Sequence, residues 1–305
     1  MNSKKIGIAI VAPSGYTLDD AALARGIAWL EAQGHTVRNY FDTAGVFQRF
    51  GGTDEARLAQ LNAAAADPQV DVVMALRGQY GMTRLLPQID FARMAASGKI
   101  FVGYSDFTAF QMALLAKTGA ISYAGPMFLS DFAVREPLAF TTDDFFACLA
   151  GPTHRISQAV SGNPALQVQG TLWGGNLAMI NSLIGTAYFP QVDDGIVFVE
   201  DVNEHPYRVE RMLLQLMQSG VMARQRALVL GDFSAYKITP VDNGYDFDAM
   251  LAYLRKTLPC PVLTGLQFGH CAKRVTLPFG AHAALRSDAD GFEMTISAYP
   301  HLGNA

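Results

Sequence analysis

A serine stands where an apolar run gives way to a helical pattern. Ile100–Tyr104 is strand-like, Ser105 follows at once, and apolar residues at helical spacing continue over Phe107–Lys117. A serine in a strand-to-helix turn exposes its hydroxyl, and the N–H groups and dipole of the following helix favour an oxyanion nearby. The pattern resembles a nucleophile elbow, although Phe107 replaces the usual glycine. Ser105 or Asp106 could equally cap the helix that follows. The position alone favours this structural role over a catalytic one.

A nucleophilic serine needs a base, and His270 is the best placed of the six histidines. It lies in the glycine-punctuated segment Thr264–Arg274, before a predicted strand. A polar histidine on a loop held by rigid elements is suited to proton transfer. The neighbouring Cys271 raises the alternative of a thiol mechanism. Because adjacent residues of an extended chain point to opposite sides, we expect Cys271 to be incidental.

A carboxylate should orient the imidazole. Glu200 ends the apolar run Ile196–Glu200, and a carboxylate at the end of a buried strand is costly unless a partner pairs with it. Glu204 competes for this role. It lies just before Pro206 at a predicted helix start, where acidic residues are favoured by the dipole alone. We therefore predict Glu200 as the orienting group.

The bulk composition narrows the class of protein. The 305 residues are 50% hydrophobic and 16% charged, which is typical of a globular chain, and their length suggests two domains. A net charge of −4 without a basic block argues against nucleic acid as a partner. No apolar run reaches the roughly 18 residues of a membrane helix, so no membrane association is expected. The three cysteines form no CxxC pair, and a reducing cytoplasm is the simplest location.

The element pattern predicts an α/β fold. Short apolar runs alternate with amphipathic stretches over residues 1–140, as in a mostly parallel sheet flanked by helices. Turn residues in 141–165 suggest a linker around one short helix. Residues 166–305 are predicted as a mixed α/β domain that ends in closely spaced short strands, as in a small barrel-like sheet.

Several stretches, in order along nearly the whole chain, resemble the bacterial LD-carboxypeptidases, also called muramoyltetrapeptide carboxypeptidases. They are Ala12-Pro-Ser-Gly-Tyr, Gly103-Tyr-Ser-Asp-Phe-Thr-Ala, Gly170-Thr-Leu-Trp-Gly-Gly-Asn-Leu, Val199-Glu-Asp-Val-Asn-Glu-His-Pro-Tyr-Arg-Val-Glu-Arg, Gly265-Leu-Gln-Phe-Gly-His and Thr276-Leu-Pro-Phe-Gly-Ala.

The resemblance implies a Ser–His–Glu triad at Ser105, His270 and Glu200, in a cleft between an N-terminal domain with the serine and a C-terminal domain with the other two. It implies a cytoplasmic enzyme without metal or cofactor, often a homodimer. The implied substrate is the murein tetrapeptide, free or sugar-linked, which is cut between the L-centre of diaminopimelate and the terminal D-alanine.

One loop departs from the family pattern. The family commonly reads Arg-Gly-Gly-Tyr-Gly after the third strand, and this chain has Gln79 as the third residue of Arg77-Gly-Gln-Tyr-Gly. The resemblance implies that this loop gives a backbone donor to the oxyanion, so the expected donors are the N–H of Asp106 and one at Gly78 or Gln79. Because Gln79 adopts positive φ less readily than glycine, the loop geometry is in question.

A carboxypeptidase must also bind a free carboxylate, and Arg77 is the first candidate because its guanidinium suits bidentate pairing. Lys273 and Arg274 are weaker candidates, which we expect to form a solvated strand edge. Trp173 and Asn176 either line the cleft or form a tight turn at a helix start; the sequence leaves both open.

The sequence leaves three alternatives open. The first is a peptidase of the same superfamily of the microcin C immunity type, which cleaves an acyl-sulfamoyl or peptidyl nucleotide. The second is a protein that binds muropeptides without cutting them. The third, a metallohydrolase, finds little support, since the sequence has no HExxH motif and no close His/Asp cluster.

Overall fold

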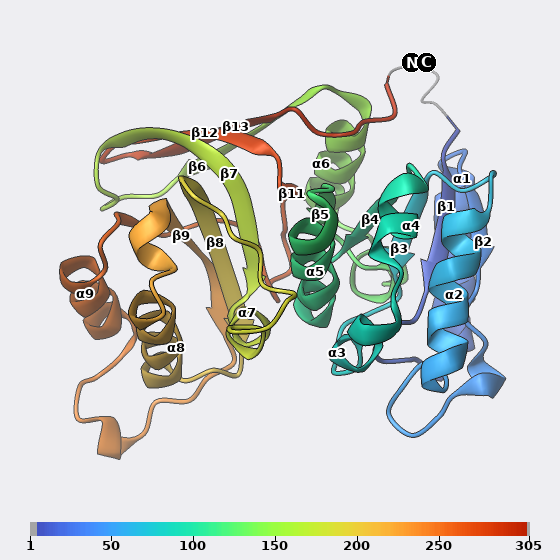
Figure 1. Cartoon of the computed structure of the whole chain (residues 1–305), viewed down its shortest axis with the longest axis horizontal. Helices are drawn as coiled ribbons and strands as arrows, with labels where there is room; N and C mark the ends of the chain where they lie inside the picture. The colour runs from blue at the N-terminus through green and yellow to red at the C-terminus, as the bar shows by residue number, and fades with distance from the viewer. Residues whose placement is uncertain (1–4, 304–305) are drawn as a thin grey trace.

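The computed structural model describes residues 5–303 and contains two β-sheets with helices packed against them (Figure 1). The first sheet has the strand order β11-β5-β4-β3-β1-β2 and the second β10-β9-β8-β7-β12-β13-β6. The predicted α/β class is thereby confirmed. In the described part of the chain, no helix is both long enough and apolar enough to cross a bilayer.

Five parallel strands form the body of the first sheet. Strands covered on both faces read as continuous apolar runs, and β1, β3 and β4 are buried throughout. The strands are β1 (Gly7–Val11), β2 (Thr36–Asn39), β3 (Val72–Ala75), β4 (Ile100–Gly103) and β5 (Ser122–Ala124). The helices of this half are α1 (Asp20–Ala32), α2 (Asp54–Ala66), α3 (Met82–Leu85), α4 (Phe91–Ala96), α5 (Thr108–Thr118) and α6 (Ala139–Ala150).

A strand from the far end of the chain completes the first sheet. β11 (Leu277–Phe279) pairs antiparallel with β5, although most of the second sheet lies between them in sequence. Figure 1 shows β11 beside β5, next to α5 at the middle of the molecule. The two halves of the chain are therefore joined by a strand pair as well as by the connecting chain.

The second sheet changes from antiparallel to parallel within one long strand. The first part of β7 pairs antiparallel with β12, and its last part pairs parallel with β8. The order has two distinct edges, β10 and β6, so the predicted barrel-like sheet is in fact open. Its strands are β6 (Thr153–Ala159), β7 (Leu166–Asn176), β8 (Gly195–Val202), β9 (Gln225–Ser234), β10 (Val262–Leu263), β12 (His282–Ser287) and β13 (Gly291–Ser297). Its helices are α7 (Leu177–Ser182), α8 (Pro206–Gln218) and α9 (Phe247–Thr257).

Residues 141–165, predicted as a linker, contain most of α6 and all of β6. β6 pairs with β13 and forms one edge of the second sheet, with alternating buried and exposed side chains. The turn residues lie at the ends of these elements and do not form one long connection. The domain boundaries at residues 140 and 166 stay a prediction.

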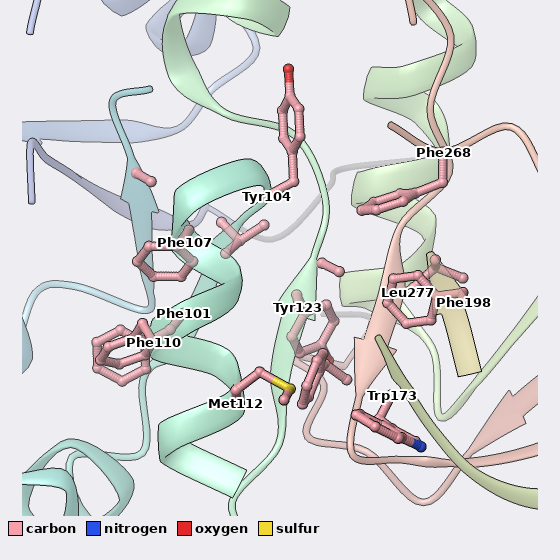
Figure 2. Packing of buried hydrophobic residues seen from close by; sticks show 14 of the residues in the cluster. Phe101, Tyr104, Phe107, Phe110, Met112, Tyr123, Trp173, Phe198, Phe268 and Leu277 are labelled. Atoms are coloured by element: carbon pink, nitrogen blue, oxygen red, sulfur yellow. The ribbon is translucent and has the colours of Figure 1, made fainter. Parts of the chain in front are cut away.

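Both sheets share one apolar core. Figure 2 shows Phe101, Phe107 and Phe110 grouped beside α5, and Phe198, Phe268 and Leu277 grouped across Tyr123 from them. The Phe198 ring, on β8, packs edge-on against Phe268 at 5.3 Å and against Phe279 of β11 at 6.4 Å. The junction between the sheets is therefore filled by aromatic side chains, which hold the two halves in a fixed relation.

Truncation at this junction should destabilise the whole molecule. Leu277 is fully buried, so Leu277→Ala should lower the free energy of unfolding by about 2–5 kcal/mol through lost burial and a residual cavity. Leu18 is 72% exposed, so Leu18→Ala is the matched control and should change stability by no more than about 0.5 kcal/mol. Urea denaturation measures both, and equal stabilities of the two variants would contradict this account of the core.

Candidate active site

Ser105 lies directly beyond the carboxyl end of β4 and before α5. Its φ is +61°, in the left-handed region that residues other than glycine rarely adopt. Such conformations cost on the order of 1–3 kcal/mol and cluster at functional sites. Phe107, in place of the usual glycine, stacks on Phe110 with 4.9 Å between ring centroids. A Cβ at Gly103 would lie 2.8 Å from the Phe107 ring, so the glycine that permits this tight turn precedes the serine.

The structure brings Ser105, His270 and Glu200 into one hydrogen-bonded chain. His270 Nε2 lies 3.1 Å from Ser105 Oγ, and His270 Nδ1 lies 2.7 Å from Glu200 Oε2. The serine follows β4, the glutamate belongs to β8, and the histidine lies between β10 and β11. Glu204, the competing carboxylate, instead pairs with Arg208 at 3.8 Å near the start of α8. The three predicted residues therefore meet at the junction of the two sheets.

The electrostatic surroundings suit His270 to proton transfer. Burial alone would lower the pKa of His270, but the hydrogen bond and the charge of Glu200, together with the charge of Asp201, outweigh it and raise the pKa above 6.5. The charge of Arg274 acts in the opposite direction. Because Glu200 has no exposed surface, solvent screens this interaction little. The raised pKa makes the neutral imidazole a stronger base for the serine proton.

Asn176, for which the sequence left open a place in the cleft or a turn at a helix start, caps the start of α7 and supports two carboxylates. Its Nδ2 donates to Glu200 Oε1 at 3.2 Å and to Asp201 Oδ1 at 3.0 Å, and its Oδ1 accepts from the Met179 N–H at the start of α7. Asn176 also lies opposite Glu200 in the parallel pairing of β7 with β8. The side chain is buried and its groups are used, so it satisfies Glu200 from the side that His270 does not reach.

Trp173, for which the sequence left open a place in the cleft or a tight turn, is buried in the core and does not line a cleft. The side chain is 1% exposed, its Nε1 donates to Gln225 Oε1 at 2.9 Å, and its ring packs edge-on against Phe189. The part of β7 that pairs with β8 is buried on both faces, and a large aromatic residue there belongs to the core.

The loop after β3 approaches the serine closely. A Cβ at Gly78 would lie 2.7 Å from Ser105 Oγ, so only glycine fits at this position. Gln79 has φ of +69° and therefore adopts the left-handed conformation despite its side chain, at a cost of roughly 1–2 kcal/mol. The loop geometry that the sequence left in question is thus accessible to glutamine. The N–H groups of Gly78, Gln79 and Asp106 stay predicted oxyanion donors.

The Asp106 side chain contacts the end of the loop that follows β3. Its Oδ2 accepts from Ser14 Oγ at 2.5 Å and from the Met82 N–H at 2.7 Å. Burial raises the pKa of Asp106, while these two hydrogen bonds and the charge of Arg57 oppose the rise. The carboxylate ties the residue after the nucleophile to the segments that follow β1 and begin α3. Asp106 is therefore more than a helix cap, and the sequence did not indicate this role.

Arg77 lies at an open groove of about 890 Å³. One guanidinium nitrogen, Nη1, donates to the Tyr16 carbonyl at 3.0 Å. Gln79, Arg49 and Asp19 line the same groove, which therefore includes part of the loop after β3 and carries two guanidinium groups and one carboxylate. This arrangement is compatible with the predicted binding of a carboxylate by Arg77, which stays a prediction.

Residues after His270 differ from one another in environment. Lys273 is exposed, as expected, with its ammonium 5.8 Å from the Phe140 ring centroid. Arg274 was expected to be solvated, and this is wrong: it is 2% exposed and forms an ion pair with Asp131. Burial raises the pKa of the Cys271 thiol, which disfavours the thiolate and supports an incidental role for this residue.

Comparison with protein-family models identifies both halves of the chain. Residues 8–125 match the model described as the LD-carboxypeptidase N-terminal domain, and residues 169–285 match that of the LD-carboxypeptidase C-terminal domain. Among residues 5–303, no group of three or more His, Cys, Asp or Glu side chains could hold a metal ion.

Individual relatives agree with the family models. The crystal structure of a muramoyltetrapeptide carboxypeptidase from Oxalobacter formigenes is 50% identical, with a TM-score of 0.93 over 96% of this chain and 99% of that one. A Bacillus subtilis protein named "Probable murein peptide carboxypeptidase" is 27% identical over 92% of this chain and 88% of its own length. The microcin C7 self-immunity protein MccF of Escherichia coli is 25% identical over 89% of this chain and 87% of its own length.

The titration of His270 tests the electrostatic account. NMR should give this imidazole a midpoint above 6.5, and Glu200→Gln should lower it because the variant removes the negative charge that raises it. Protonated His270 then stabilises the wild-type fold below its unfolded pKa, and this contribution is lost as the pH rises through the folded value. Equal midpoints in the two proteins would show that Glu200 does not control the imidazole.

Proposed function

The chain belongs to the LD-carboxypeptidase family, and on this premise we propose that it is a serine carboxypeptidase with Ser105 as nucleophile, His270 as base and Glu200 as orienting carboxylate. The observation that carries the proposal is the continuous hydrogen-bonded chain from Ser105 Oγ through the imidazole to a fully buried carboxylate. This order of hydroxyl, imidazole and carboxylate is that of an activated serine.

The reaction is acyl transfer in two stages. Neutral His270 takes the proton from Ser105 Oγ as this oxygen attacks the scissile carbonyl carbon, and Glu200 stabilises the imidazolium that forms. His270 then donates this proton to the leaving amine, and the peptide bond breaks to give an acyl-serine. Water, deprotonated by His270, attacks the ester and releases the shortened peptide and the free hydroxyl.

The tetrahedral intermediate carries a negative oxygen that needs donors. We assign this role to the Asp106 N–H and to an N–H of Gly78 or Gln79, because the Gly78 backbone lies against Ser105 Oγ. Donors held in advance of the reaction stabilise the charge without reorganisation, and loss of one costs about 3–4 kcal/mol in such sites. The strained φ angles of Ser105 and Gln79 are consistent with a fixed arrangement of this kind.

The proposed substrate is a murein tetrapeptide, free or sugar-linked, from which the enzyme releases the terminal D-alanine. Support comes from the 50% identity to the muramoyltetrapeptide carboxypeptidase from Oxalobacter formigenes over nearly both full chains. Arg77 is proposed to bind the free carboxylate, since its guanidinium lies in a groove that is also lined by Gln79, from the loop that approaches Ser105. We further propose a cytoplasmic enzyme that acts in peptidoglycan recycling and forms a homodimer.

A second candidate is a peptidase of the microcin C immunity type, favoured by the 25% identity to MccF. Both candidates use the same attack on a carbonyl carbon and differ in what lies on the leaving side. On the leaving side, a carboxypeptidase substrate carries a small amino acid with a free carboxylate, whereas the substrate of an immunity-type peptidase carries a nucleotide.

The serine-dependent release of D-alanine tests the function. The wild-type protein should remove one alanine from a tetrapeptide that ends in D-Ala, as read by mass, and should leave an L-Ala-ended peptide intact. Ser105→Ala should lower kcat/KM by at least about 10³-fold, because removal of a nucleophile disables the whole triad. Ser182→Ala, on the exposed surface of α7, is the control and should retain full activity.

The same assay distinguishes the alternatives. An acyl-sulfamoyl adenosine, incubated side by side, should be cleaved much more slowly than the tetrapeptide. Faster cleavage of the nucleotide substrate would favour the immunity-type function. Binding of the tetrapeptide without any release of alanine by the wild-type protein would identify a binding protein and contradict the proposal.

A further inference from the structure

His270 lies in a segment with little regular structure. Residues 264–276, between β10 and β11, form neither helix nor strand. Gly269, next to the histidine, has φ of +132°, and a Cβ there would lie 2.9 Å from Glu200 Cβ, so the backbone must pass close to the carboxylate. Strand hydrogen bonds do not hold this segment. Other contacts must therefore fix its backbone if the imidazole is to stay between the serine hydroxyl and the glutamate carboxylate.

Arg274 contacts the backbone on both sides of His270. Its Nε and Nη2 donate to the Gly269 carbonyl at 3.2 and 3.0 Å, and Nη2 also donates to the Cys271 carbonyl at 2.7 Å. One guanidinium thus binds the carbonyl of the residue before the histidine and the carbonyl of the residue after it. The planar fork of arginine allows several such bonds at once, and a single ammonium cannot reproduce them.

The guanidinium is itself fixed by the other half of the molecule. It forms an ion pair with Asp131, which lies in the short helical turn Phe128–Phe132 of the first half. Nη2 donates to the Tyr104 hydroxyl at 3.1 Å, and the guanidinium carbon lies 4.3 Å from the centroid of the Tyr104 ring. Tyr104 immediately precedes Ser105, so the group that holds the histidine segment also contacts the residue before the nucleophile.

Tyr104 contacts both the Arg274 guanidinium and the His270 imidazole. Its ring packs edge-on against the His270 ring, with 5.1 Å between centroids. Its hydroxyl donates weakly to Ser130 Oγ at 3.4 Å, and Ser130 Oγ donates to Asp131 Oδ2 at 2.8 Å. Arg274, Asp131 and Tyr104 are all buried, so the bonds among these three residues form with little competition from water.

We propose that Arg274, held by Asp131 and Tyr104, is a positioning residue that fixes the His270 imidazole between Ser105 and Glu200. This inference rests on the proposed function, and it goes beyond that function because Arg274 touches neither the reacting hydroxyl nor the carboxylate. It acts through His270, by binding the backbone carbonyls of Gly269 and Cys271, the residues on either side of the histidine. The nucleophile comes from the first sheet, and the base lies in the connection from the second sheet back to it, so the bond across this junction sets their separation.

The variant Arg274→Lys separates positioning from charge, because lysine keeps the positive charge beside Asp131 and loses the fork. A misplacement of about 1 Å in an active site can lower turnover by roughly 100-fold, so kcat should fall by between ten- and a hundredfold. KM should stay within about threefold of the wild-type value, since no substrate contact is removed. The NMR signal of the His270 Nδ1–H proton, downfield in the wild type because of its bond to Glu200, should broaden or disappear.

The matched control is Arg25→Lys. Arg25 also donates two bonds to one backbone carbonyl, that of Ala133, through Nε at 2.9 Å and Nη2 at 2.7 Å, directly after the turn that contains Asp131. It should retain the wild-type kcat. Equal losses of kcat in the two variants would show a general loosening of the fold and overturn the proposal, as would wild-type kcat in Arg274→Lys.

A second variant covers the case in which Arg274→Lys does not fold. Tyr104→Phe keeps the ring against His270 and removes only the hydroxyl that Arg274 contacts, so kcat should fall several-fold with the fold retained; an unchanged kcat would count against the network. If the wild-type protein releases no D-alanine, the proposed function fails, but the Nδ1–H signal still tests the positioning role. Retention of that signal in Arg274→Lys would then contradict it.

Discussion

A fully buried carboxylate, hydrogen-bonded to an imidazole, is the interaction on which the rest of the site depends. Glu200 ends the apolar core of β8, where an unpaired charge would be strongly unfavourable. Asn176 satisfies one carboxylate oxygen and His270 the other, at 3.2 and 2.7 Å. The cost of burying Glu200 is offset only if His270 Nδ1 bonds to its carboxylate. In that position of the histidine segment, the other ring nitrogen, Nε2, faces Ser105.

This constraint explains why the chain returns to its first sheet. β11 pairs with β5 beside β4, whose carboxyl end carries the serine, and the histidine segment leads directly into β11. The aromatic contacts among Phe198, Phe268 and Phe279 fill the junction, as Figure 2 shows for the first two. Ser105, Glu200 and His270 can therefore lie within hydrogen-bond distance of one another without a movement of one half of the chain toward the other.

The sequence predicted some of this and not the rest, for physical reasons. Buried parallel strands and a polar residue at the end of each are local signals, and they indicated β4, β8 and the candidates Ser105 and Glu200, although position alone favoured a helix cap for Ser105. The family resemblance joined these to His270. The position of Trp173 stayed open in the sequence because a tryptophan next to glycines suits either a cleft or a turn, and the pairing of β7 with β8, which buries it, is non-local. Arg274 was misjudged because its partner Asp131 is distant in sequence, and no local pattern distinguishes a buried arginine from a solvated one. β6 lies in a segment rich in turn residues, and its pairing with β13 is equally non-local.

The central claim is that Ser105 and His270 act as one catalytic unit. Because each group is useless without the other, the losses caused by their removal should not add. The kcat/KM of the double variant Ser105→Ala/His270→Ala, compared with both single variants on a D-Ala-ended tetrapeptide, measures this most directly. The account predicts that all three variants have nearly the same residual activity. A double variant whose loss equals the product of the two single losses would show that the serine and the histidine act independently.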